Sequence, residues 1–136
     1  MSEQQIKPDK RALTPGTLLA PVPAVLVSCV AEGYRPNIIS LAWVGTVCSE
    51  PPVIAIGVRQ SRHSYAILEK GGDFVVNLPT HSQTAIVDFC GTRTGREVDK
   101  FQAAGLTAIP STIVASPLIA ECPVNLECKV SSSLLL

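Results

Sequence analysis

The chain has 136 residues, of which 46% are hydrophobic and only 4% aromatic, so its apolar mass is aliphatic and suits the β-rich core of one domain. Eleven basic residues balance eleven acidic ones, which excludes the strong positive field that holds nucleic acid or an anionic membrane. Residues 18–31 form the longest weakly polar stretch and fall short of the roughly 20 apolar residues of a membrane span. Because the N-terminus is polar and mixed in charge, we expect a cytoplasmic protein without nucleic-acid or membrane partners.

The first half of the chain predicts antiparallel strands. Residues 23–32 predict a first strand, residues 33–36 a turn, and residues 37–48 a second strand rich in Ile, Val and Thr. A connection this short makes the two strands an antiparallel pair. The prolines within residues 49–52 then interrupt the pairing because they donate no backbone hydrogen bond, and residues 53–59 predict a third strand.

The second half predicts short helices between strands. Ser61 can begin a helix that ends at Gly71 and Gly72, residues 74–78 predict a fourth strand, and Thr80 or Ser82 can begin a second helix. Four segments complete the chain: a basic loop at 90–96, a helical turn at 98–104, a weakly extended segment at 106–115 and a strand at 120–130. Short sequential strands with helices in the connections predict a mainly β fold, an antiparallel and partly closed barrel.

Several common catalytic signatures are absent from the sequence. No glycine spacing fits the dinucleotide fingerprint, residues 91–96 lack the spacing and the Lys-Ser/Thr end of a P-loop, and there is no Gly-x-Ser-x-Gly elbow. With two histidines and five cysteines, none of them in a Cys-x-x-Cys pair, we expect no metal site. Most of the cysteines are interpreted as small buried hydrophobic residues.

Residues 59–65 carry the strongest local indication of a binding site. They place two arginines, a histidine and several hydroxyls at a strand end and in the first turn of the helix that follows. Cations there oppose the helix dipole, whereas a bound phosphate would satisfy the arginines, the hydroxyls and the free N–H groups together. The alternative is a solvated polar connection whose charges face water.

Two further segments are candidates for ligand contacts. Residues 37–48 carry the only tryptophan, Trp43, among small residues that leave room for a planar ligand; the alternative is a core strand with a buried tryptophan. Cys48, at the end of this segment, can touch a ligand or lie inert in the core. Residues 90–96 and the nearby Lys100 can close over a ligand, or form a surface loop whose charges pair with neighbouring carboxylates.

Taken together, these segments resemble the flavin reductase-like family of FMN-binding split barrels, in particular its flavoredoxin and ferric-reductase-like branch. The matching motifs are, in chain order, Pro36 to Cys48, Pro51-Pro52, Arg59 to Tyr65, Phe74 to Pro79, Cys90 to Arg96, Asp99 to Phe101 and Pro123 to Cys128. No single motif decides the resemblance, but their order and spacing are fairly specific. It covers about residues 15–130 and divides the chain into a polar N-terminal arm, 1–14, and an FMN-binding domain, 15–136.

The resemblance implies an antiparallel Greek-key split β-barrel that forms a homodimer and binds FMN close to the dimer interface. One group of residues is implied along the isoalloxazine ring and the ribityl chain: Asn37, Trp43, Val44, Thr46 and Cys48. A second group is implied around the phosphate: Arg59, Ser61, His63, Ser64 and Tyr65. Lys100 is implied near the flavin or its phosphate.

Two functions follow from the resemblance. The first is an oxidoreductase that transfers electrons from NADH or NADPH through FMN to free flavin, ferric iron or a redox protein. Because the redox chemistry belongs to the cofactor, no catalytic base is expected. The alternative is a flavin-binding electron carrier without NAD(P)H activity of its own, and a barrel that serves only as an interaction module is a third possibility. The family pattern continues beyond residue 136, so we expect the chain to lack the C-terminal part of that domain.

Overall fold

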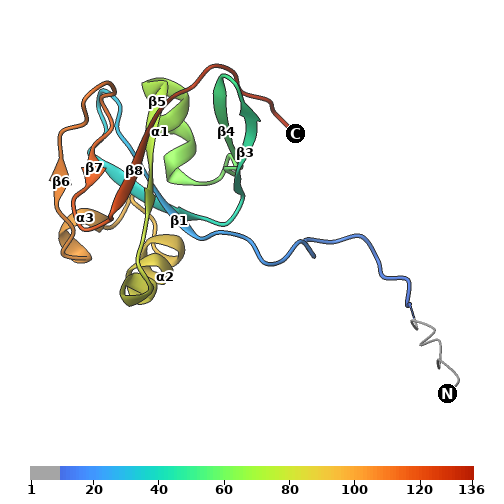
Figure 1. Cartoon of the computed structure of the whole chain (residues 1–136). Helices are drawn as coiled ribbons and strands as arrows, with labels where there is room; N and C mark the ends of the chain where they lie inside the picture. Colours follow the sequence, from blue (N-terminus) through green and yellow to red (C-terminus); the bar gives the residue numbers. More distant parts are fainter. Residues whose placement is uncertain (1–9) are drawn as a thin grey trace, which may run out of the picture.

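Strands and short helices alternate along residues 10–136, the part of the chain that the computed structural model describes. The elements are β1 (Val25–Cys29), β2 (Asn37–Leu41), β3 (Val44–Ser49), β4 (Pro52–Ile56), α1 (His63–Gly71), β5 (Asp73–Leu78), η1 (His81–Gln83), α2 (Thr84–Thr92), α3 (Lys100–Ala103), β6 (Ala108–Ile109), β7 (Leu118–Ile119) and β8 (Val124–Lys129). Four strands form an antiparallel sheet in the order β2-β1-β5-β8, and β3-β4 and β6-β7 form two-stranded sheets (Figure 1). Residues 1–9 of the predicted arm lie outside the described part, and residues 10–24 extend away from the sheets (Figure 1).

Different helices cover the two faces of the central sheet. Val27 of β1 lies on the face that α1 covers with Ile67. Its neighbour Leu26 lies on the opposite face, which α2 and α3 cover with Cys90 and Phe101. β1 is therefore buried along its whole length, which explains why its sequence is apolar except for Ser28 and does not alternate between apolar and polar residues.

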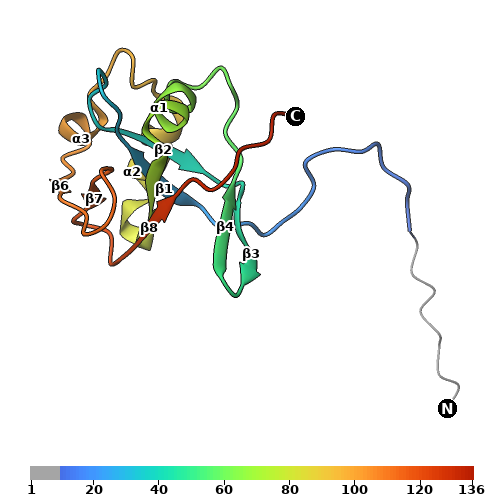
Figure 2. The ribbon, with the colours of Figure 1, turned by 90° about the horizontal axis from the view of Figure 1, so that it is seen from above.

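The predicted pairing of the first two strands is confirmed, but the predicted second strand, residues 37–48, is two strands. β2 pairs antiparallel with β1 and ends at Leu41, opposite Val25. Beyond Val25 the partner strand runs into Pro23, which has no N–H to donate to the sheet. The chain therefore leaves the sheet, and β3 pairs with β4 in a separate hairpin that projects from the end of the sheet (Figure 2). The predicted third strand, residues 53–59, is β4 and ends earlier, at Ile56.

The predicted helix after the third strand is α1, and it ends as predicted. Gly72 has a left-handed φ of 73°, and its N–H donates to the carbonyl oxygen of Leu68 at 3.0 Å. The predicted start was wrong by one residue. Arg62 and not Ser61 is the N-cap residue, and no side chain caps the first turn.

The helix α2 corrects the predicted loop at residues 90–96. A capping box formed by Thr80 and Gln83 begins the turn η1, and α2 then continues through Thr92. The side chain of Cys90 in the last turn of α2 is fully buried in the core. The N–H of Arg93 donates to the Phe89 carbonyl oxygen at 3.1 Å, so the helical bonding continues to the end of α2. The loop therefore begins only at Arg93.

Three of the five cysteines are buried, which confirms the interpretation of most of them as small hydrophobic residues: Cys29, Cys90 and Cys122. Burial raises the pKa of Cys29 to about 12, so this thiol stays protonated at neutral pH. Of the two alternatives for Cys48, inert burial in the core is wrong, because the hairpin β3-β4 leaves this residue exposed.

The last third of the domain contains the predicted helical turn as α3 and the predicted final strand as β8. The side chain of Asp99 caps α3 by accepting a hydrogen bond from the Gln102 N–H at 3.1 Å. A side chain of the central sheet holds β7: the fully buried Asn77 accepts the N–H of Ile119 at 3.0 Å. Among residues 10–136, no helix is long and apolar enough to cross a membrane.

Candidate functional site

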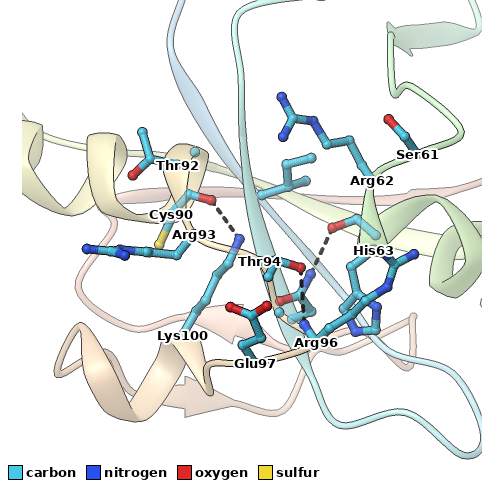
Figure 3. A pocket seen from close by; sticks show the side chains of 15 residues that line it. Ser61, Arg62, His63, Cys90, Thr92, Arg93, Thr94, Arg96, Glu97 and Lys100 are labelled. Carbon is cyan, nitrogen blue, oxygen red and sulfur yellow. Dashed lines mark hydrogen bonds between the residues drawn. The ribbon is translucent and has the colours of Figure 1, made fainter.

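A cleft of about 240 Å³ lies where the start of α1, the start of β2, the end of α2 and the loop before α3 meet (Figure 3). Its charged side chains are four cations and a carboxylate: Arg62, Arg93, Arg96, Lys100 and Glu97. Its neutral polar side chains include Asn37, Ser61, His63, Ser64, Thr92 and Thr94. Because the chain as a whole has a net charge of +0, this excess of positive charge is local. A cleft of this kind favours a small anion over a polyanion.

The start of α1 contributes to this preference for an anion. The first N–H groups of a helix have no partner within the helix and carry a partial positive charge. In α1 no side chain caps them, and no acidic residue lies in the first turn. Ser61, Arg62, His63 and Ser64 line the cleft at this helix end, so hydroxyl, guanidinium and backbone donors converge on one place. This is the donor set of a phosphate site at a helix N-terminus.

A buried hydrogen bond fixes the wall of the cleft between β2 and α1. The side-chain amide of Asn37 donates to the Ser64 hydroxyl at 2.8 Å, and both residues are buried. His63 lies beside this pair, and its ring centroid is 5.8 Å from that of Tyr34. Burial, Arg96, Arg35 and Lys100 together lower the pKa of His63. The imidazole is therefore held neutral among cations at neutral pH.

Lys100 is a buried cation at the floor of the cleft, and only 3% of the residue is exposed. Its ammonium group donates to the carbonyl oxygens of Ile38 and Cys90, each at 2.7 Å. Figure 3 shows the bond to Cys90, whose carbonyl lies in the last turn of α2, where helical carbonyls lack an N–H partner. Burial lowers the pKa of Lys100. Lys100 thus joins β2, α2 and α3 around the cleft.

The loop of residues 93–97 closes the cleft opposite α1. The guanidinium of Arg35 donates to the Gly95 carbonyl at 3.0 Å, and the Arg96 N–H donates to the Thr94 hydroxyl at 3.3 Å. Figure 3 shows the side chain of Arg96 running from this loop toward His63. The loop therefore presents a cation to the same helix end that Arg62 flanks.

A second hollow of about 190 Å³ adjoins the cleft and shares Arg62 and Gly91 with it. Trp43 lines this hollow and keeps 49% of its surface exposed. The guanidinium of Arg59 lies 5.4 Å from the centroid of the Trp43 ring, a cation–π arrangement. An exposed aromatic face beside a cationic cleft suits a ligand that carries both a planar ring and an anionic group.

The structure brings together most of the residues that the sequence predicts at a site. Five of them line the cleft: Asn37, Ser61, His63, Ser64 and Lys100. Two line the adjoining hollow: Trp43 and Arg59. Four lie outside both: Val44, Thr46, Cys48 and Tyr65.

The four outliers have two physical explanations. Val44, Thr46 and Cys48 follow the point at which the chain leaves the central sheet, and β3 carries them along the hairpin with β4. Thr46 and Cys48 are exposed there. Tyr65 belongs to α1, but its hydroxyl donates to the Glu69 carboxylate at 3.2 Å on the same helix.

Several polar residues that line the cleft were not predicted as site residues, among them Arg62, Arg93, Thr94 and Arg96. Arg62 lies within the segment 59–65, which indicated a phosphate site. The other three lie within the basic loop, whose glycines and hydroxyls were the available signal. Whether that loop meets a ligand or only water depends on tertiary packing between segments almost 60 residues apart, which local sequence patterns do not report.

The chain is similar to a known domain family and to solved structures. The model of the flavin reductase-like domain matches residues 18–135. The solved structure of flavoredoxin from Desulfovibrio vulgaris (Miyazaki F) is 33% identical, with a TM-score of 0.88 over 93% of this chain and 69% of that chain. An FMN-binding domain of a flavin reductase-like enzyme from Shewanella baltica is 25% identical, with a TM-score of 0.73 over 79% of this chain and 56% of that chain.

A curated relative from Archaeoglobus fulgidus, described as an uncharacterized protein, is 32% identical over 96 residues, which are 71% of this chain and 54% of the relative. The chain thus spans little more than half the length of this relative. The predicted fold class is confirmed: an antiparallel, mainly β split barrel with short helices. The family model covers nearly all of the described residues. The chain therefore belongs to the flavin reductase-like domain family.

Proposed function

We propose that the chain is the flavin-binding part of an FMN-dependent oxidoreductase that transfers electrons from NADH or NADPH through FMN to free flavin, ferric iron or a redox protein. The observation that carries this proposal is the junction of two hollows. A cationic cleft at the uncapped start of α1 adjoins a hollow lined by Trp43, and the two share Arg62 and Gly91. FMN combines a planar ring with a phosphate, and membership of the flavin reductase-like family supports the same ligand.

The donors of the cleft fit a phosphate monoester. At neutral pH such a group carries a charge of about −1.5 to −2 and accepts several hydrogen bonds. Arg62 and Arg96 supply guanidinium donors, Ser61 supplies a hydroxyl, and the start of α1 supplies free N–H groups. The buried ammonium of Lys100 adds a fixed positive charge below them. The lowered pKa of His63 means that its imidazole adds no further positive charge to the ligand-free cleft at neutral pH.

The hollow around Trp43 fits the ring system. FMN, when bound, supplies the redox chemistry, while the protein supplies binding, orientation and exclusion of water. The ring face of Trp43 and the guanidinium of Arg59 form a flat, partly apolar wall. The buried Asn37–Ser64 hydrogen bond fixes the wall of the adjoining cleft between β2 and α1. These residues orient and hold the cofactor, so none of them has to act as an acid or base.

We also propose that the protein is a homodimer with FMN near its interface. Val47 on the β3-β4 hairpin is 64% exposed, and Trp43, directly before β3, is 49% exposed. Large apolar side chains left exposed beside a binding hollow are typical of an interaction surface. A second copy that covers them would also shield the ring end of the ligand from water.

A second candidate function is a flavin-binding electron carrier without NAD(P)H activity of its own. The similarity to a structure described as flavoredoxin favours it. Both candidates predict a protein that binds FMN, and they differ in its reduction. Only the oxidoreductase has its FMN bleached by NADH or NADPH in a stopped-flow experiment.

The test is an absorbance titration of the purified chain with FMN, followed by rapid mixing with each nicotinamide nucleotide. Binding with reduction supports the oxidoreductase, and binding without reduction supports the carrier. A chain that remains colourless after incubation with FMN contradicts both.

A further inference from the structure

Gly95 occupies a position in the cleft where a side chain has no room. It is buried in the loop of residues 93–97. A Cβ atom built on it would meet the side-chain amide of Asn37, 2.6 Å from Cγ, and would lie 2.8 Å from Cδ2 of His63. Real Cβ atoms essentially never approach other heavy atoms within 3.0 Å. The φ angle of Gly95 lies outside the left-handed region. Glycine is therefore required here because a side chain would clash, and not because of the backbone conformation.

The residues that Gly95 touches cannot easily give way. Asn37 is 2% exposed, begins β2, and donates from its side chain to the buried Ser64 hydroxyl at 2.8 Å. His63 begins α1 and lies against the ring of Tyr34. From the other side, the Arg35 guanidinium donates to the Gly95 carbonyl at 3.0 Å and holds the loop in place. Any side chain at position 95 must therefore move the loop and not its neighbours.

The position of the loop decides where its cations lie. Arg96 follows Gly95 directly and runs toward His63 (Figure 3). After burial, Arg96 and then Arg35 are the main causes that lower the pKa of His63. The pKa of His63 therefore depends on how closely the loop of residues 93–97 approaches α1. The other charged groups that line the cleft are Arg62, Arg93, Glu97 and Lys100.

We propose that Gly95 is a positioning residue for anion binding: because it has no side chain, the loop of residues 93–97 closes on Asn37 and His63 and holds Arg96 at the phosphate end of the cleft. This inference rests on the proposed function of the cleft as a phosphate site. Gly95 itself does not have to touch the ligand. Its role is to let the loop of residues 93–97, which carries Arg96, approach the start of α1 closely.

The test compares Gly95→Ala with Gly16→Ala, a matched control at a site where the nearest atoms lie 3.9 Å away. The pKa of His63 is measured by NMR titration of the ligand-free protein, with His81→Gln to identify the other imidazole. FMN affinity is measured separately by fluorescence. We expect Gly95→Ala to raise the pKa of His63 toward its ordinary value and to weaken FMN binding about tenfold, the loss of about one charge-assisted contact. Gly16→Ala changes neither.

A second variant keeps the proposal testable should Gly95→Ala not fold. Arg35→Lys retains the positive charge near His63 but lacks the planar fork that reaches the Gly95 carbonyl. A raised His63 pKa in this variant reports loop movement and not lost charge. A folded Gly95→Ala or Arg35→Lys protein with an unchanged His63 pKa, or with unchanged FMN affinity where the wild type binds FMN, overturns the proposal. A wild type that does not bind FMN while Gly95→Ala shifts the His63 pKa refutes the proposed function and leaves the loop geometry standing.

Discussion

Replacing Lys100 by methionine removes a buried charge while nearly preserving the shape of the side chain. Two carbonyl oxygens, of Ile38 and Cys90, then lose donors that lie 2.7 Å away. A buried acceptor left without a partner costs about 1–3 kcal/mol, so the gross loss is roughly 2–6 kcal/mol. Methionine fills the space and no ammonium has to be desolvated, which places the net loss near the lower end, about 2–3 kcal/mol.

The assay is urea unfolding of the ligand-free protein followed by circular dichroism. We expect a lower midpoint with an unchanged slope, because the same surface is exposed on unfolding. Lys129→Met is the control, since Lys129 is exposed at the end of β8 and its replacement should change stability by less than about 0.5 kcal/mol. A Lys100→Met protein as stable as this control would refute the reasoning, because Lys100 would then not be needed to satisfy the two carbonyls.

Three further predictions concern the segment between β6 and β7, the buried Asn77 and the hollow lined by Trp43. The Glu127 carboxylate accepts hydrogen bonds from the N–H groups of Thr112 and Ile113, and these bonds lower its pKa. The charged carboxylate therefore stabilises this segment above the ordinary glutamate pKa, and the stabilisation is lost as the pH falls through the lowered pKa. The amide of Ile113 should therefore lose protection from hydrogen exchange on acidification in the wild type, and not in Glu127→Gln. Asn77→Leu should destabilise the fold by at least about 3 kcal/mol in the same urea assay, because the buried amide joins β1, β5 and β7; a loss under about 1 kcal/mol would contradict this. Trp43→Ala should weaken FMN and riboflavin alike, by about tenfold each in a fluorescence titration, whereas a loss confined to FMN would argue against a ring contact.

Much of the central sheet follows from local sequence. The apolar run of β1, the short turn after it and the β-branched residues of β2 predict an antiparallel pair, which is what forms. Gly72 marks the end of α1 because its left-handed φ of 73° suits glycine. Glycine and proline act through the backbone of their own residue, so their effects can be read without knowledge of the tertiary structure.

The division of the segment 37–48 into β2 and β3 could not be predicted in the same way. The segment is uniformly suited to extended structure, and the break after Leu41 depends on where its partner β1 begins. Val44, Thr46 and Cys48 were predicted at the site on the expectation of one continuous strand, and Tyr65 on the expectation that its side chain faces the site. The structure places all four outside both hollows. Long-range pairing, and not local propensity, decided this outcome.

The basic loop shows the same dependence on long-range packing. Its charges were compatible with a binding loop or with a solvated surface loop. The close approach of Gly95 to Asn37 places the loop at the cleft, with Arg96 near the start of α1. The sequence contains both residues but no local pattern that brings them together.

If the cleft at the start of α1 binds the phosphate of FMN, the chain must discriminate between FMN and riboflavin. Riboflavin has the same ring and ribityl chain but no phosphate. We expect the chain to bind FMN at least about tenfold more tightly than riboflavin, and we expect Arg62→Gln together with Arg96→Gln to remove most of this difference. Equal dissociation constants for the two ligands in the wild type, measured by quenching of flavin fluorescence, would contradict it.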